Sequence, residues 1–241
     1  MITYEVGAKT SWFDRSLVFN AAVFFEDFSD KQASSVAILA NGLPGVKPVN
    51  AAAAEVWGLE IDATWQPIES LMFTGSYAYL HARYKDFKSL TSNPGSIATA
   101  GECVIKMVES ASFCEIDNSG NSLENVPTHS LNISGRYTHT ISDALSVYIE
   151  MDGRYQGKRF DNSSNSRWYD GYWLSDLQVG LRGENWELIG YVKNVFDDDT
   201  IRVGTTTTDL RTFTLPSTIF NVGKPGLPDP RTFGVRANFR F

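Results

Sequence analysis

The stretch Arg-Thr-Phe-Gly-Val-Arg-Ala-Asn-Phe-Arg-Phe, residues 231–241, ends the chain and decides its fold class. Its side chains alternate between apolar and polar with the period of two that marks a β-strand. The apolar face carries Phe233, Val235, Ala237, Phe239 and Phe241. Chain ends usually fray in polar residues. A terminal strand that closes on an aromatic residue is therefore predicted to be held in a sheet, with one apolar and one aqueous side.

The length of this strand helps to decide whether it belongs to a globular protein or crosses a membrane. Strands of globular proteins average about 5–6 residues, whereas a strand that crosses a membrane needs about 9–11. The 241-residue chain is 42% hydrophobic, yet it has no apolar run near the roughly 18 residues of a membrane helix. Any membrane crossing must therefore use strands. The alternative is an edge strand of a soluble β-sandwich.

The net charge and the N-terminal sequence limit the possible partners and the possible export signal of the protein. The formal net charge of -7 offers no basic surface for phosphate groups, so a nucleic-acid partner is not expected. Met1-Ile2-Thr3 leads straight into strand-like sequence, without the charged and apolar regions of a signal peptide. An exported protein of this sequence would be a mature product or a piece of a longer chain.

The same alternation recurs along the chain and predicts an all-β antiparallel meander. Nine strands are expected, at residues 3–12, 17–28 with an extension over 31–39, 57–66, 71–84, 131–141, 145–156, 177–182, 186–196 and 231–241. The eighth strand is ambiguous, because Ile189 and Tyr191 share a face with Glu187 and Lys193.

The connections between these strands alternate between short turns and long segments, which places all the long segments at one end of the sheet. The long segments, near residues 41–48, 85–128, 157–171 and 197–230, are expected to be irregular loops. Aromatic residues gather towards the two strand ends, as in the two girdles of a transmembrane barrel. They are Trp12 and Trp65 at the short-turn end, and Tyr4, Trp57, Tyr79 and Tyr155 towards the long-loop end.

Four segments carry a resemblance to a known family. They are YEVGAK at 4–9, VWGLE at 56–60, YVKNVFD at 191–197, and RTFGV at 231–235 before the terminal Phe241. In this order they resemble the β-barrel of TonB-dependent outer-membrane receptors. The resemblance implies a 22-stranded transmembrane barrel whose lumen holds a separate plug domain. Residues 1–241 would then be the C-terminal portion of the barrel, its last nine or so strands, with the plug and the N-terminal strands absent.

The resemblance also implies location, partners and activity. The protein would lie in the Gram-negative outer membrane, in contact with lipid, with the barrel-insertion machinery and, through the missing plug, with the TonB energy-coupling complex. The implied function is energy-coupled uptake of a scarce extracellular solute, most often a ferric siderophore, with no cofactor. Cobalamin, haem, nickel complexes and saccharides stay open as ligands. The closing-strand signal would be carried by Phe233, Val235, Phe239 and Phe241.

Side chains that could contact a ligand are few, and each has an alternative role in the barrel wall, the girdles or loop packing. They are Tyr77, Tyr84, Tyr148, Arg154 and Trp168. The rival functions are a porin-like passive pore and an outer-membrane barrel enzyme.

Catalysis has little support in the sequence. The three histidines, His81, His129 and His139, do not have metal-ligand spacing. Ser130 follows His129 but points to the opposite strand face, so the two do not form a catalytic pair. Residues 197–199 are three aspartates that could bind a cation, although a solvated acidic patch is the alternative. No catalytic or metal-binding residue is assigned.

Cys103 and Cys114 are the only cysteines, and they lie in the same long segment. The compartment implied by the resemblance is oxidising, and thiols there pair readily. A Cys103–Cys114 disulfide is therefore predicted, with two free thiols as the alternative.

Overall fold

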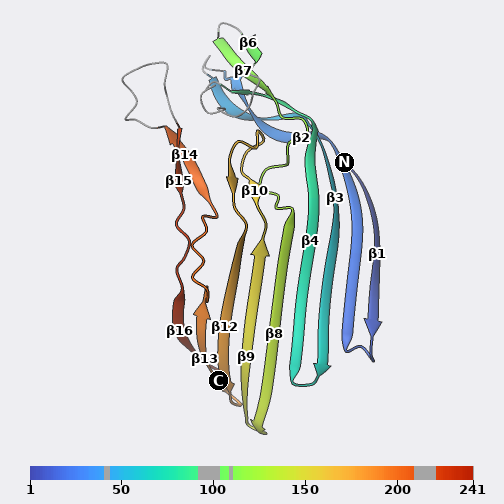
Figure 1. The fold of residues 1–241 in the computed structure, drawn as a ribbon, viewed down its shortest axis with the longest axis vertical. Helices are drawn as coiled ribbons and strands as arrows, with labels where there is room; N and C mark the ends of the chain where they lie inside the picture. The colour runs from blue at the N-terminus through green and yellow to red at the C-terminus, as the bar shows by residue number, and fades with distance from the viewer. Residues whose placement is uncertain (41–43, 92–103, 109–110, 209–220, 241) are drawn as a thin grey trace.

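The computed structural model describes residues 1–40, 44–91, 104–108, 111–208 and 221–240. Within these residues, nine long strands form one antiparallel sheet in the order β1-β2-β3-β4-β8-β9-β12-β13-β16 (Figure 1). The strands are β1 (Ile2–Trp12), β2 (Leu17–Ile38), β3 (Pro44–Ile68), β4 (Leu71–Asp86), β8 (His129–Ser142), β9 (Leu145–Gln156), β12 (Tyr172–Arg182), β13 (Trp186–Lys193) and β16 (Thr232–Phe239). The predicted all-β meander is confirmed. The described residues contain no helix with the length and apolarity to cross a membrane.

The short turns lie at one end of the sheet and the long connections at the other (Figure 1). The turn between β1 and β2 is tight because Phe13, Asp14 and Arg15 all have positive φ, at 52°, 53° and 72°. The amide of Ser16 donates to the carbonyl of Phe13 over 3.0 Å and closes this turn. The separation of turns and long connections is the one that the sequence predicts.

The long connections are not wholly irregular, and this part of the prediction was wrong. Residues 85–128 contain a separate three-stranded sheet of β5 (Lys88–Thr91), β6 (Val104–Val108) and β7 (Ala111–Asp117). The next two connections contain the pairs β10 (Arg159–Phe160) with β11 (Trp168–Tyr169), and β14 (Gly204–Thr208) with β15 (Asn221–Pro225). These strands have only 2–7 residues each. That length is too short for alternation to stand out among Gly, Ser and Asn residues.

The connection expected at residues 41–48 is also shorter than predicted. β3 already begins at Pro44, which pairs with Ile38 of β2. Proline is compatible with the first position of a strand, where its missing N–H costs no ladder hydrogen bond. The predicted extension of β2 is confirmed, with a register shift after Phe28 where Asp30 has a φ of 54°.

The outer face of the sheet is apolar and exposed, with Val6, Val23 and Val179 at 75%, 55% and 45% exposure. Aromatic contacts edge this face. Trp57 lies 5.4 Å from Tyr79 between ring centroids at the long-loop end, and Trp65 lies 5.7 Å from Phe73 at the short-turn end. Trp65 lies eight positions after Trp57 on β3, about 26 Å along an extended strand. With the strand tilt of about 35–45° found in transmembrane barrels, the two rows would lie about 20 Å apart along the barrel axis, near the roughly 25 Å height of the apolar band.

Two of the histidines belong to the long-loop aromatic row. The ring of His81 stacks 4.9 Å from that of Trp57, and the ring of His129 lies 5.2 Å from that of Tyr79. Both side chains therefore act as aromatic members of the outer face.

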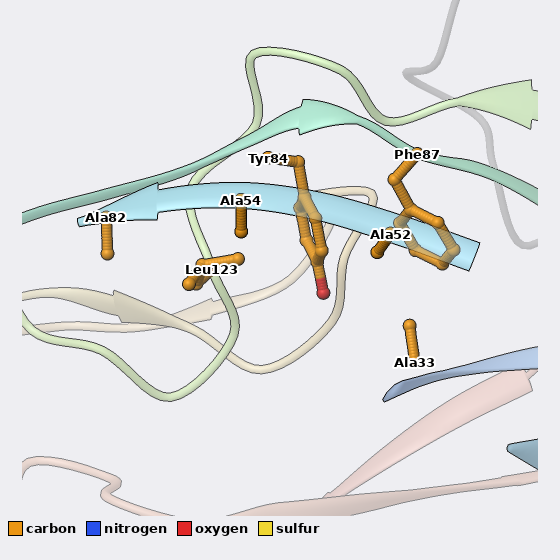
Figure 2. Packing of buried hydrophobic residues seen from close by; sticks show 7 residues of the cluster. All are labelled: Ala33, Ala52, Ala54, Ala82, Tyr84, Phe87 and Leu123. Carbon is orange, nitrogen blue, oxygen red and sulfur yellow. The ribbon is translucent and has the colours of Figure 1, made fainter. Parts of the chain in front are cut away.

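A packed core lies beyond the aromatic row, between the upper parts of β2, β3 and β4 and the segment before β8. Figure 2 shows its members, Ala33, Ala52, Ala54, Ala82, Tyr84, Phe87 and Leu123. Tyr84 is 1% exposed, and its hydroxyl donates to Oε2 of Glu124 over 2.6 Å. Burial, together with the hydrogen bond and negative charge of Glu124, raises the pKa of the Tyr84 phenol. This core fixes the connection between β4 and β8 against the sheet.

Packing shows which way the side chains of β13 point, the strand whose two faces the sequence left ambiguous. Ile189 is 8% exposed and pairs with Gly180 of β12. The ring of Tyr191 covers Gly234 of β16, where an added Cβ atom would lie 2.2 Å from the tyrosine hydroxyl. Both side chains occupy the polar inner face, so this face is not lined by polar groups alone.

Candidate functional site

The inner face of the sheet is hollowed into a cavity of about 560 Å³. Side chains from β3, β4, β8, β9 and β12 line it, which shows that the sheet is concave there. Register aligns its polar residues across the strands, since Asp62 pairs with Ser76, Ser76 with Asn132, and Asn132 with Arg154. Period-two alternation places these side chains on one face of their strands, and the strand pairing brings them together.

Three carboxylates line the cavity, together with the guanidinium of Arg154. Asp152 and Asp176 are direct cross-strand partners in β9 and β12, and Asp62 lines the same cavity. Like charges directly opposite each other are unfavourable. Asp176 is held by the backbone amide of Asn194, which donates to its Oδ1 over 2.8 Å. Asp62 accepts a 2.9 Å hydrogen bond from the Asn20 amide.

A charged network closes the short-turn end of the inner face. The guanidinium of Arg136 lies 3.9 Å from the ring centroid of Tyr148, and that of Arg182 lies 5.6 Å from it. Arg136 also pairs with Glu150 over 3.1 Å, and Arg182 pairs with Glu187 over 2.8 Å. Tyr148 is 4% exposed and is thus a wall residue.

A cluster of arginines and tyrosines lies at the long-loop end of the inner face. Arg159 of β10 lies 5.2 Å from the ring of Tyr169, and Arg202 lies 4.8 Å from the ring of Tyr172. Arg159 donates through Nη2 to the carbonyl of Arg202. The cluster therefore joins the β10–β11 hairpin to the connection after β13. Arg159 and Arg202 are 43 positions apart in the sequence. The sequence analysis did not identify either of them.

The first of the three consecutive aspartates orders the chain and the second holds the cluster. Asp198 accepts a 3.0 Å hydrogen bond from Arg202, and Asp197 accepts one of 2.8 Å from the backbone amide of Arg231. Burial opposes the charge of Asp198, but hydrogen bonds from Arg202 and Thr200 prevail and lower its pKa. Neither carboxylate is simply a solvated acidic patch.

Asn194 of the Asn-Val-Phe-Asp segment fixes the start of this connection. Its side-chain amide donates to the carbonyls of Asp198 and Asp229 over 3.0 and 3.1 Å. Its Oδ1 accepts from the amide of Asp198 over 2.9 Å. Asn194 has a φ of 51°, a left-handed conformation that asparagine adopts more readily than most residues. The segment is a structural clamp between β13 and β16.

The structure separates the five predicted ligand-contact candidates. Arg154 lines the cavity, and Trp168 is 50% exposed on the β10–β11 hairpin, 4.3 Å from the Lys158 amine. Tyr77 hydrogen-bonds His129 over 2.8 Å on the outer side, while Tyr84 and Tyr148 are buried. Only Arg154 and Trp168 are therefore placed where a ligand could reach them.

Two predicted features extend beyond the described residues. Cys114 is 3% exposed in β7, but Cys103 lies outside the described part of the chain, so the disulfide stays a prediction. Phe233, Val235 and Phe239 are exposed on the outer side of β16, and Phe241 also lies outside the description. Their role as a closing-strand signal stays a prediction as well.

The described residues contain no candidate metal-binding site. No group of three or more His, Cys, Asp or Glu side chains in that part of the chain could hold a metal ion. His139 lies near the β8–β9 turn, where it pairs with Val147, whereas His129 begins β8 at the opposite end of the strand.

Comparison with solved structures finds the same sheet in much longer proteins. The siderophore receptor PiuA from Acinetobacter baumannii matches 98% of this chain with a TM-score of 0.64 and 17% identity. The ferric yersiniabactin uptake receptor FyuA from Yersinia pestis matches 99% with a TM-score of 0.69 and 15% identity. The pyoverdine receptor FpvA from Pseudomonas aeruginosa matches 99% with a TM-score of 0.60 and 18% identity. The match covers only 28–29% of each of these receptors.

Comparison with protein families gives the assignment. Residues 1–195 match the family described as TonB dependent receptor-like, beta-barrel. Its members are outer-membrane transporters and not enzymes. The matched region includes the apolar outer face, the aromatic rows and the hollowed inner face. The chain therefore belongs to the TonB-dependent receptors of the outer membrane and forms part of their β-barrel.

Proposed function

We propose that this chain forms the last nine strands of the 22-stranded barrel of a receptor for energy-coupled uptake of a ferric siderophore. The observation that carries the proposal is the fit of 98–99% of the chain onto receptors named for siderophores or their ferric complexes. At 15–18% identity the fit supports the fold. The choice of a ferric siderophore as ligand rests on the ligands for which these receptors are named.

The edges of the sheet support a longer barrel. β1 pairs only with β2, and β16 pairs only with β13, among the strands described. In lipid each unsatisfied backbone group costs several kcal/mol, so open sheet edges do not persist there. Further strands of the same receptor would cover both edges. The plug and the segment that contacts the TonB complex would likewise come from outside residues 1–241.

The inner face supports a bound solute rather than a freely open channel. Its cavity is lined by carboxylate, amide, hydroxyl and guanidinium groups. The Arg159 and Arg202 guanidinium groups are held in place at the long-loop end. Groups fixed in this way suit recognition of one class of solute, because little side-chain entropy is lost when they bind it.

The proposal is tested with the complete receptor in its own outer membrane. Cells that lack the receptor should take up radioactive iron from its ferric chelate more slowly under iron limitation, and the complete gene should restore the rate. Removing the inner-membrane coupling complex should abolish the same uptake. Uptake that continues without coupling would instead support the porin-like passive pore. Normal iron uptake with loss of cobalamin or saccharide uptake would show another ligand class.

A further inference from the structure

A hollow of about 620 Å³ lies on the outer face of the sheet. It spans the neighbouring strands β4, β8, β9 and β12, which Figure 1 shows side by side. Strand register puts its residues on one face, since Phe73 pairs with Gly135 and Gly135 pairs with Met151. The outward-facing side chains around the hollow are apolar apart from one serine. They are Phe73, Ile133, Met151, Trp173, Ser175 and Phe196.

Two glycines make the hollow. Gly135 of β8 and Gly153 of β9 both line it, and neither has a side chain to fill the space above the backbone. An added Cβ atom at Gly135 would lie 3.2 Å from the ring of Phe73, and one at Gly153 would lie 2.6 Å from the ring of Trp173. The two rings therefore lie against the glycines and form walls, whereas the backbone forms the floor. Such walls are ordered before anything binds, so little side-chain entropy is lost on binding.

The lining of the hollow suits hydrocarbon. Ser175 is the one polar side chain that faces it from the outer side, among the residues described. The Ser175 hydroxyl accepts a 2.6 Å hydrogen bond from the indole N–H of Trp173, and Ser175 is only 1% exposed. Water needs about two to four polar partners to stay in a cavity, and an apolar cavity remains dry or takes an apolar ligand.

The membrane supplies hydrocarbon at the height of the hollow. The chain belongs to the outer-membrane receptors, so its apolar outer face meets lipid. Phe73 stands in the short-turn aromatic row beside Trp65, whereas Trp173 lies 6.3 Å from Tyr155, towards the long-loop end. The hollow therefore lies inside the apolar band and reaches the row at the short-turn end. Short turns of outer-membrane barrels face the periplasm, and the leaflet on that side consists of phospholipid.

Packing favours a held chain over a passing one. Lipid tails are as apolar as the wall, so van der Waals contact and not the hydrophobic effect decides what stays on this surface. An empty hollow forfeits such contacts. We propose that the hollow holds one acyl chain of a phospholipid from the periplasmic leaflet, and that this lipid exchanges more slowly than the lipid around the rest of the wall. The inference does not depend on which solute the receptor transports.

The test uses the complete receptor in vesicles of phosphatidylethanolamine and phosphatidylglycerol. Native mass spectrometry after extraction into a mild detergent should find one phospholipid retained by each unaltered receptor. Met151→Trp should lower this retention by roughly 5- to 30-fold, because its ring occupies the hollow and removes the contacts of the chain. Phe196→Ala is a second variant, which removes a wall without adding volume, and it should lower retention as well.

The matched control is Ile149→Trp. Ile149 lies two positions before Met151 on the same strand and face, and the two are 46% and 45% exposed, but Ile149 does not line the hollow. This variant should retain the phospholipid like the unaltered receptor. A phosphatidylethanolamine with a photoactivatable group midway along one chain locates the site, and its cross-links should gather on the β8 and β9 residues of the hollow.

Four results would overturn the inference. The first is equal retention in all three variants, and the second is cross-linking spread evenly over the outer face. Retention of lipopolysaccharide in place of phospholipid from native membranes would assign the hollow to the other leaflet. A receptor dimer that Met151→Trp separates would assign it to a second copy of the chain.

Discussion

The ring of Tyr148 in β9 lies directly on Gly180 of β12, where an added Cβ atom would come within 2.2 Å of two ring carbons. The ring cannot move away easily, because Arg136 and Arg182 flank it and its hydroxyl donates to Glu187 over 3.2 Å. The glycine is required here by close approach of a neighbouring side chain. The contact holds β9 and β12 together near the short-turn end.

Gly180→Ala should therefore destabilise the complete receptor by about 1–3 kcal/mol, the usual cost of overpacking. Urea unfolding in detergent would measure the change. Gly190→Ala is the matched control, since a Cβ atom there meets nothing within 4 Å. That variant should be neutral or slightly more stable, because alanine restricts the unfolded chain. Equal effects of the two substitutions would refute the role of the Tyr148 contact.

The raised pKa of the buried Tyr84 phenol predicts that the protein loses stability at alkaline pH. Its pKa in the folded protein is raised above the ordinary 10.0 by burial and by Glu124. The unfolded chain therefore releases the phenolic proton first, and stability falls as the pH rises above about 10. The contribution is fully present below that pH. This loss of stability would be followed between pH 8 and 11 by the rate of proteolysis at the long-loop ends of β2, β3 and β4.

Tyr84→Phe is the matching variant for this pH effect. It should remove part of the alkaline loss, because phenylalanine cannot ionise. At neutral pH it should cost about 1 kcal/mol through loss of the hydrogen bond to Glu124. An unchanged alkaline profile in the variant would assign the effect to another group.

The Cys103–Cys114 pairing is tested without any substitution. Unreduced peptides from the complete receptor should contain the two cysteines linked, and alkylation before digestion should modify neither. A disulfide that closes a loop of about 12 residues is worth roughly 3 kcal/mol in the chain-entropy model. Cys114→Ser should then make the connection before β7 more sensitive to protease. Recovery of both cysteines in alkylated form would rule the pairing out.

The orientation in the membrane is tested by labelling intact cells with a membrane-impermeant maleimide. Asp170 lies at the long-loop end and Asp143 in the turn between β8 and β9, and both are exposed. Asp170→Cys should be labelled and Asp143→Cys should not. The reverse pattern would place the long loops in the periplasm and contradict the topology.

Residues 1–241 expressed alone should not yield a folded monomer. A nine-stranded sheet with two open edges should aggregate or be degraded, because its edge groups lack partners in lipid. Refolding in detergent followed by electrophoresis with and without heating would show the outcome. A heat-modifiable, protease-resistant monomer would indicate a complete small barrel and would favour the passive pore.

Much of the sheet could be predicted because its strands are long. Trp57, Leu59 and Ile61 alternate with Gly58, Glu60 and Asp62 over a span that no loop maintains by chance. The short strands could not be found in this way. β10 has two residues, and its pairing with β11 depends on a hairpin that alternation does not encode.

The candidate site was less predictable than the fold. Arg159 and Arg202 belong to different connections, and their sequence separation carries no sign of contact. Tyr84 and Tyr148 showed the opposite problem, because an aromatic residue on the inner side of a strand can face solvent or be covered by a neighbouring chain segment. Glu124 and the pair Arg136 and Arg182 cover these two tyrosines. Only side-chain packing decides such cases.

The strand order has a consequence for evolution. Each strand of the main sheet hydrogen-bonds only to the strands before and after it in that sheet. A duplication or deletion of one hairpin would therefore change the circumference of the barrel and leave the other pairings intact. Connections such as the β5–β7 sheet could likewise be exchanged between relatives without altering the wall. Recombination of whole hairpins or connections is thus compatible with an unchanged pairing of the remaining strands.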